Sequence, residues 1–146
     1  MRAPAHLLAA AATFAMSCAH CSRYPESKML PLAAALTKLT AACEGTLQFG
    51  ENAADLDGDA LLHAATHDDP SLLGPFSGWV IKVVNVDHHA VVLLCDGLDR
   101  GVLEDVGCTG KPDAHHWQHK ELPGCRVTLD VRAACADPPE KDPPAE

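Results

Sequence analysis

The chain has 146 residues, with 20 acidic and 11 basic side chains and a formal net charge of −9. This length allows one domain with one hydrophobic core. Because nucleic acid is bound through clustered Lys and Arg, and bases or sugars through aromatic platforms, the acidic balance and the 4% aromatic content argue against both kinds of partner.

The N-terminal segment has the three-part layout of a secretory signal. Arg2 supplies a basic start, an apolar run follows from Leu7 to Met16, and small residues end the segment. The apolar run is about half of the ~20 residues that span a bilayer. We therefore predict a signal peptide over residues 1–17, or up to residue 19 if cleavage is of the plain secretory type. An exported chain with seven cysteines is expected to form disulfides.

Residues 15–18 (AMSC) resemble a bacterial lipobox, in which the cysteine is lipidated and becomes the new N-terminus. The resemblance implies a lipoprotein anchored through Cys18. The CxxC spacing that Cys18 makes with the next cysteine is typical of redox pairs, but here we interpret it as an overlap with the cleavage region. Without Cys18 an even set of six disulfide candidates remains: Cys21, Cys43, Cys95, Cys108, Cys125 and Cys135.

After a linker at residues 18–28, the segment Leu30 to Glu44 is predicted to be a helix, with a proline in its first turn and a glycine just past its end. One helical face is apolar and should pack on a sheet. That face carries Leu32, Leu36, Leu39 and Cys43. Cys43 on this face suggests a structural disulfide, and the alternative is a buried free thiol.

A second, shorter helix is predicted from Asp59 to Thr66. The acidic stretch from residue 55 to residue 59 lacks the glycine and the final glutamate of a calcium loop, so we interpret it as helix capping. His63 and His67 lie four residues apart on this helix, close enough to share a divalent metal ion. The alternative is that both belong to a solvated helix face.

The stretch from residue 78 to residue 96 contains the longest concentration of β-branched and apolar residues, and the rest of the fold should be arranged around it. Trp79 to Val86 and Ala90 to Cys95 are two strand-length runs separated by a short polar break. They predict a β-hairpin. Because neither run alternates between apolar and polar residues, both faces should be largely covered.

Three more segments complete the chain. Asp99 to Val106 is predicted to form about two helical turns, and residues 109–124 a loop. Arg126 to Arg132 alternates apolar and polar side chains and predicts a strand. The loop contains a further candidate metal cluster, His115, His116 and His119. Bridging Cys108 with Cys125 would close this loop, and it is the preferred disulfide pair.

These elements predict an α+β fold in which a small antiparallel sheet of three or four strands, with the 78–96 hairpin at its centre, is packed by the N-terminal helix and cross-linked by disulfides. The single domain should span residues 29–136, and the Pro-rich acidic tail at 137–146 should be disordered.

Three functions remain open. The first is a small exported cell-envelope protein, a lipoprotein or a secreted protein, that binds another envelope or secreted protein as inhibitors and immunity proteins do. It would contact the membrane only through its lipid anchor. The second is a periplasmic protein that binds a divalent metal through its histidine clusters. The third is an enzyme with a Cys-His nucleophile, ranked last because the sequence contains no catalytic motif and assigns no catalytic residue.

Overall fold

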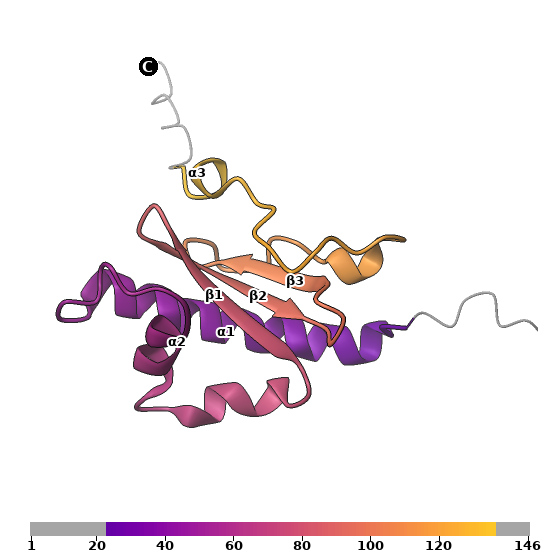
Figure 1. Cartoon of the computed structure of the whole chain (residues 1–146), viewed down its shortest axis with the longest axis horizontal. Coiled ribbons are helices and arrows are strands. Elements are labelled where there is room, and N and C mark those ends of the chain that lie inside the picture. Colours follow the sequence, from indigo (N-terminus) through magenta and orange to yellow (C-terminus); the bar gives the residue numbers. More distant parts are fainter. Residues whose placement is uncertain (1–22, 137–146) are drawn as a thin grey trace, which may run out of the picture.

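The computed structural model describes residues 23–136, in which one long helix lies across one face of a three-stranded antiparallel sheet (Figure 1). This arrangement is the predicted α+β fold. The predicted signal segment at 1–17, Cys18, Cys21 and the tail at 137–146 lie outside the described residues. Among residues 23–136 we find no helical segment whose length and hydrophobicity suit a bilayer-spanning role.

Helix α1 (Glu26–Phe49) is longer at both ends than the predicted helix at residues 30–44. Met29 before the predicted start and Leu47 beyond the predicted end are both buried, so the apolar stripe continues in both directions. Packing of this stripe outweighs the glycine at position 45, which the prediction used as a stop signal. The middle of the stripe is as predicted, with buried Leu36, Leu39 and Cys43.

The sheet has the order β1-β2-β3, with β1 (Val80–Val86), β2 (His89–Cys95) and β3 (Gly101–Val106) all antiparallel. Strand β2 lies between its two neighbours and is buried on both faces. Alternate residues of β2 belong to two apolar clusters, one against α1 and one against the C-terminal segment. The predicted hairpin with two covered faces is confirmed for this central strand.

A two-residue turn joins β1 and β2. Asp87 and His88 have φ angles of 51° and 66°, both in the left-handed region. Two left-handed residues form the type I′ turn that matches the twist of a hairpin, usually with Asn-Gly. Asp and His tolerate this region better than most other side chains, so the turn forms without glycine.

The prediction of helical turns from Asp99 to Val106 is wrong, because β3 occupies residues 101–106. All six residues of β3 are buried. The free edge of β2 offers backbone hydrogen bonds along this whole segment, and these outweigh its weak helical pattern.

The predicted strand from Arg126 to Arg132 is also wrong. No strand forms there, and a four-residue helix, α3 (Val131–Ala134), begins within it. The outer edge of β3 is already occupied by two isolated β-bridges. Glu104 pairs with Ala114, and Arg100, just before β3, pairs with Gly124. The alternation of apolar and polar residues still predicts which side chains are buried. The apolar ones pack on the cluster at the sheet face away from α1.

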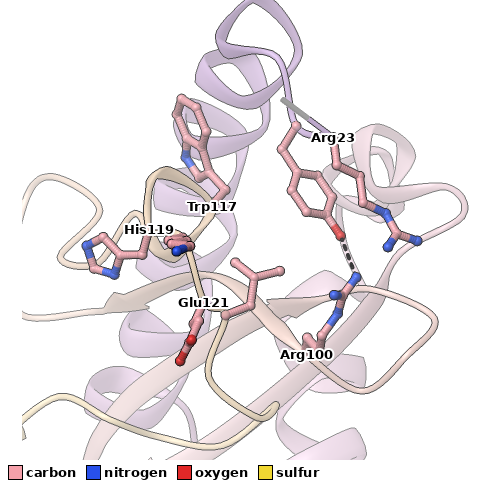
Figure 2. A pocket seen from close by; sticks show the side chains of 8 residues that line it. Arg23, Arg100, Trp117, His119 and Glu121 are labelled. Atoms are coloured by element: carbon pink, nitrogen blue, oxygen red, sulfur yellow. Dashed lines mark hydrogen bonds between the residues drawn. The ribbon is translucent and has the colours of Figure 1, made fainter. Parts of the chain in front are cut away.

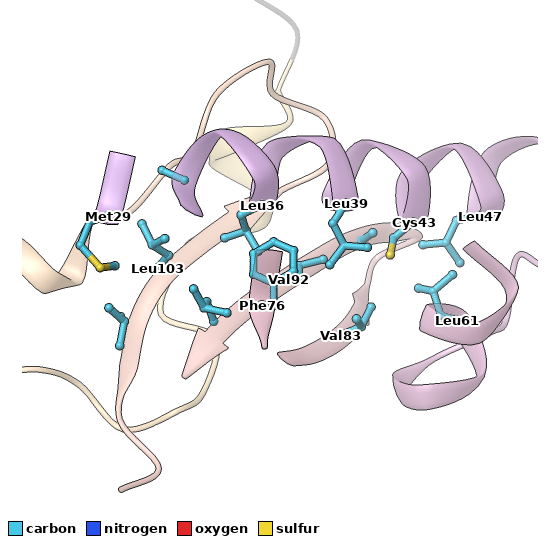
Figure 3. Packing of buried hydrophobic residues seen from close by; sticks show 14 residues of the cluster. Met29, Leu36, Leu39, Cys43, Leu47, Leu61, Phe76, Val83, Val92 and Leu103 are labelled. Carbon is cyan, nitrogen blue, oxygen red and sulfur yellow. The ribbon is translucent and has the colours of Figure 1, made fainter. Parts of the chain in front are cut away.

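Helix α2 (Gly58–Thr66) confirms the predicted short helix and is capped by Asp57, whose carboxylate accepts the Gly58 amide. The chain then passes through a 3₁₀ helix, η1 (Pro70–Phe76), before it enters β1. The main core lies where α1, α2 and the sheet meet (Figure 3). Its largest buried side chains include Met29, Leu36, Leu39, Leu61, Leu94 and Leu103.

Two disulfides tie the C-terminal segment to the sheet, Cys95–Cys125 and Cys108–Cys135. The preferred pairing of Cys108 with Cys125 is therefore wrong, although all four cysteines were candidates. Cys95 and Cys125 both lie in the buried cluster on the sheet face away from α1.

Cys43 lies buried on the opposite side of the sheet and forms no disulfide with any cysteine of residues 23–136, where a disulfide was expected. Burial raises the pKa of this thiol to about 12, with a smaller contribution from the neighbouring Glu44. At neutral pH Cys43 is therefore a protonated, apolar core residue.

Candidate functional site

An open pocket of about 610 Å³ lies between the start of α1, the β2–β3 turn and the loop after the short 3₁₀ helix η2 (His116–Gln118). Figure 2 shows the side chains that line it. The lining residues are Arg23, Tyr24, Arg100, Trp117, His119, Lys120, Glu121 and Leu122. Aromatic and basic side chains therefore meet in one hollow, although they lie nearly a hundred residues apart in the sequence.

Arg100 is held rigidly on one wall of the pocket by Asp96. Its Nη2 and Nε atoms donate to Asp96 Oδ2 at 2.6 and 2.9 Å, and the Tyr24 hydroxyl donates to the same oxygen at 2.6 Å. Burial alone would raise the pKa of Asp96, but these hydrogen bonds hold it well below its usual value. Asp96 is thus charged at any physiological pH and orients both Arg100 and Tyr24.

The other two cations of the pocket are less constrained. Arg23 and Lys120 are exposed and form no ion pair with any side chain of residues 23–136. Among residues 23–136, Glu121 is the single acidic residue that lines the pocket. In a chain with a net charge of −9, three of the eleven basic side chains lining one hollow is an unusual concentration of positive charge.

Below this loop, a fully buried Glu104 carboxyl group connects β3 to the C-terminal segment. It accepts the backbone amides of Thr128 and Leu129 at 2.8 and 3.1 Å and the Thr128 hydroxyl at 2.6 Å. His116 Nε2 lies 3.0 Å from Glu104 and 3.2 Å from Thr128. Since one imidazole nitrogen contacts both groups, these residues do not form a relay through the ring, and we assign them a structural role.

The structure separates the histidines of the predicted cluster at 115–119. His116 turns inward to Glu104, His115 stacks on Trp117 with ring centroids 6.2 Å apart, and His119 faces the pocket. His116 and His119 remain neighbours, with ring centroids 6.0 Å apart. The three rings therefore do not point at a common centre.

His63 and His67 do lie together on α2, with ring centroids 5.9 Å apart, and both are exposed. Within the described part of the chain, no third His, Cys or carboxylate joins this pair in a group with metal-binding distances. A metal site on this helix therefore stays a prediction, and only His63 and His67 would supply its protein ligands.

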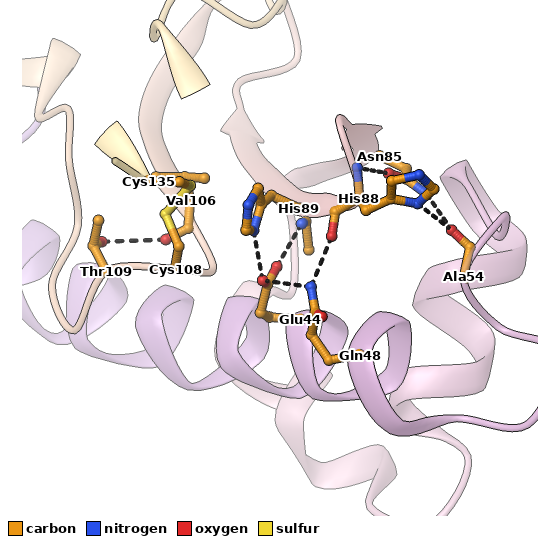
Figure 4. Close-up of polar contacts among 11 residues, drawn as sticks. Glu44, Gln48, Ala54, Asn85, His88, His89, Val106, Cys108, Thr109 and Cys135 are labelled. Carbon is orange, nitrogen blue, oxygen red and sulfur yellow. Dashed lines mark hydrogen bonds and ion pairs between the residues drawn. A yellow bond between two sulfur atoms is a disulfide. The ribbon is translucent and has the colours of Figure 1, made fainter. Parts of the chain in front are cut away.

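The group that does have metal-binding distances involves a residue that the sequence did not suggest. One ligand atom each of His89, Cys108 and Cys135 lies within 4.8 Å of the other two (Figure 4). His89 begins β2, whereas the two cysteines form the exposed disulfide beyond β3. Their proximity depends on the β2–β3 pairing and on the disulfide partners, neither of which the sequence pattern predicted.

The fold and these sites define a small, disulfide-linked α+β domain with a basic pocket. No known family model, curated protein sequence or solved structure matches the chain.

Proposed function

We propose that this protein is a small exported binding module whose basic pocket receives an acidic segment of another envelope or secreted protein. The observation that carries the proposal is the meeting of Arg23, Arg100 and Lys120 in one pocket of an acidic chain. Guanidinium groups form strong, directional hydrogen bonds with carboxylates, and a preoriented Arg100 loses little freedom on binding.

The shape and lining of the pocket favour a peptide side chain or a C-terminal carboxylate as the ligand. Tyr24, Trp117 and Leu122 provide apolar surface beside the cations, which suits the stem of an acidic side chain. The pocket is open, so a ligand can stay attached to a larger partner. An extensive acidic surface on the partner would be repelled by the rest of this chain, which limits the contact to a short segment.

The export of the protein is supported by its two disulfides, which form and persist in oxidising compartments. We propose that residues 1–17 are removed and that lipidation of Cys18 anchors the domain, in the periplasm or at the outer membrane. Intact-mass measurement of protein from its native host is expected to show a chain that begins at Cys18 and carries acyl chains. A chain that begins at Met1 with free thiols at positions 95, 108, 125 and 135 would contradict export.

Binding at the pocket is tested with two peptides of equal length, one rich in Glu and Asp and the other with Gln and Asn at the same positions. In a Trp79→Phe background, the fluorescence of Trp117 reports occupancy of the pocket. The acidic peptide is expected to bind, more weakly at higher salt, and the neutral peptide is not. Replacing Arg23 and Lys120 together by Ala should lower the affinity about tenfold or more.

The matched control is the double replacement of Lys111 and Arg126 by Ala. Both are exposed and neither lines the pocket, and their removal changes the net charge by the same amount. This variant should retain most of the affinity. An equal loss in both double variants, or no binding of the acidic peptide at low salt, would contradict the proposed function.

A further inference from the structure

We propose that His89, Cys108 and Cys135 form a redox-gated site for a thiophilic divalent cation such as Zn²⁺. The site is closed while Cys108 and Cys135 are joined and becomes available when their disulfide is reduced. This proposal is independent of the basic pocket, and it uses none of the histidines of the two predicted metal clusters.

The ligand set and its spacing suit zinc. The three ligand atoms lie within 4.8 Å of one another. Two thiolates and one imidazole match the Cys₂His set of catalytic zinc sites, in which the fourth tetrahedral position is open. Zinc with bonds of about 2.3 Å to sulfur places two thiolates about 3.8 Å apart. After reduction the two sulfurs therefore have to move apart, and Cys135 lies at the C-terminal end of the four-residue helix α3.

Glu44 supports the site from α1 and is the second observation behind the proposal. Its Oε1 lies 2.8 Å from His89 Nδ1, and its Oε2 accepts the Ala90 amide at 2.7 Å (Figure 4). With Nδ1 engaged by Glu44, Nε2 has no hydrogen-bond partner among residues 23–136 and is the nitrogen that we assign to the metal. A carboxylate on the far nitrogen of a histidine ligand orients the ring and raises its basicity, as is usual at zinc sites.

The backbone next to Cys108 is also adapted to this carboxylate. A Cβ atom on Gly107 would lie 2.4 Å from Glu44 Cβ and 2.7 Å from its Oε2. Only glycine allows the chain to pass so close to Glu44 before it reaches Cys108. The segment that carries the thiol is thus held against the group that orients His89, with the Gly107 amide donating to Ala90 O at 2.8 Å.

The two disulfides differ in their access to a reductant. Cys108 is exposed and Cys135 half-buried, whereas Cys95 and Cys125 are both buried. A small dithiol should therefore reduce Cys108–Cys135 first. Its thiolate attacks one sulfur, its second thiol resolves the mixed disulfide, and it leaves as its own disulfide. The two thiols of the protein lose their protons when the cation binds.

The test uses the full chain with Cys18 and Cys21 replaced by Ser, which removes the other closely spaced thiol pair. The protein is reduced with a dithiol, the dithiol is removed without oxygen, and Zn²⁺ is titrated against a chromophoric chelator. We expect the reduced protein to bind one equivalent more than the oxidised protein. Co²⁺ should give the thiolate charge-transfer band of a tetrahedral site, and bound Zn²⁺ should protect Cys108 and Cys135 from alkylation.

Variants separate this site from unspecific binding by thiols. His89→Ala is expected to weaken Zn²⁺ binding at least tenfold, and Glu44→Gln by about 10–100-fold. His88→Asn is the matched control, because His88 is the exposed neighbour of His89, Asn tolerates its left-handed turn position, and the affinity should stay unchanged. Circular dichroism of each reduced variant verifies that it is folded, and alkylation of the metal-free protein maps which thiols have opened.

Three results would overturn the proposal. The first is equal Zn²⁺ binding by the oxidised and reduced proteins. The second is a folded His89→Ala variant that binds as tightly as its parent. The third is opening of Cys95–Cys125 before Cys108–Cys135, because the proposed gating depends on selective reduction of the exposed disulfide.

Discussion

Replacing Glu104 by Ala is expected to lower the free energy of unfolding by about 3–5 kcal/mol. The Glu104 side chain is fully buried and accepts the backbone amides of Thr128 and Leu129. Its removal leaves these two donors and His116 without their acceptor inside the protein. Urea unfolding of the variant and the parent, monitored by fluorescence, measures the difference.

Two further variants distinguish the effect of losing the buried Glu104 network from the effect of losing a carboxylate in general. Glu121→Ala removes an exposed acid near the same loop and should change stability by less than about 0.5 kcal/mol. Thr128→Val removes only the hydroxyl that donates to Glu104 and should cost about 1 kcal/mol. If Glu104→Ala were as stable as the parent, the network would not hold the C-terminal segment on the sheet.

Replacing Asp105 by Asn is expected to stabilise the protein at pH 8, by on the order of 2 kcal/mol, and to have little effect at pH 4. Asp105 is 1% exposed on β3, and its Oδ1 atom has no hydrogen-bond partner among the described residues. Burial raises its pKa to about 7, with Thr40 opposing the shift and Asp113 adding to it. The buried acid is therefore costly when it ionises, and Asn removes that cost.

The direction of the pH effect follows from the proton balance. Between about pH 4 and pH 7 the folded protein binds the proton of Asp105 and the unfolded chain releases it. The contribution of Asp105 to stability therefore decreases as pH rises through this window. Thermal unfolding at several pH values should show a shallower decrease for Asp105→Asn than for the parent. The exposed Asp59→Asn variant should keep the parental slope, and equal slopes for Asp105→Asn and the parent would show that Asp105 does not titrate there.

Local sequence patterns predicted the elements whose burial is periodic. The apolar stripe of α1 predicted its packing against the sheet, and the two apolar runs around Asp87 predicted the hairpin. The hairpin joins two segments that are adjacent in the chain, and the apolar stripe is a face of a single helix. Side-chain periodicity is sufficient for such features, because it reports directly which face is removed from water.

The sequence shows the basic residues of the pocket only as separate charges and does not predict that they meet. Arg23 and Lys120 lie 97 residues apart (120 − 23), and nothing in their local sequence distinguishes them from Lys111 or Arg126. Their meeting depends on where α1 begins and where the loop after β3 returns. A local sequence pattern does not predict such a contact, because the contact depends on how the intervening elements pack.

The sequence by itself determined the apolar stripe of α1 and the hairpin, and its cysteine excess indicated disulfides. The tertiary structure alone decided that residues 101–106 form a strand, which cysteines pair, and that His89 lies beside Cys108 and Cys135. The physical reason is that a strand is stabilised by the edge it pairs with, and a disulfide by the geometry that brings two sulfurs together. Strand β3 depends on the free edge of β2, and each disulfide joins cysteines 27 or 30 residues apart, so both features are decided by how these segments pack together.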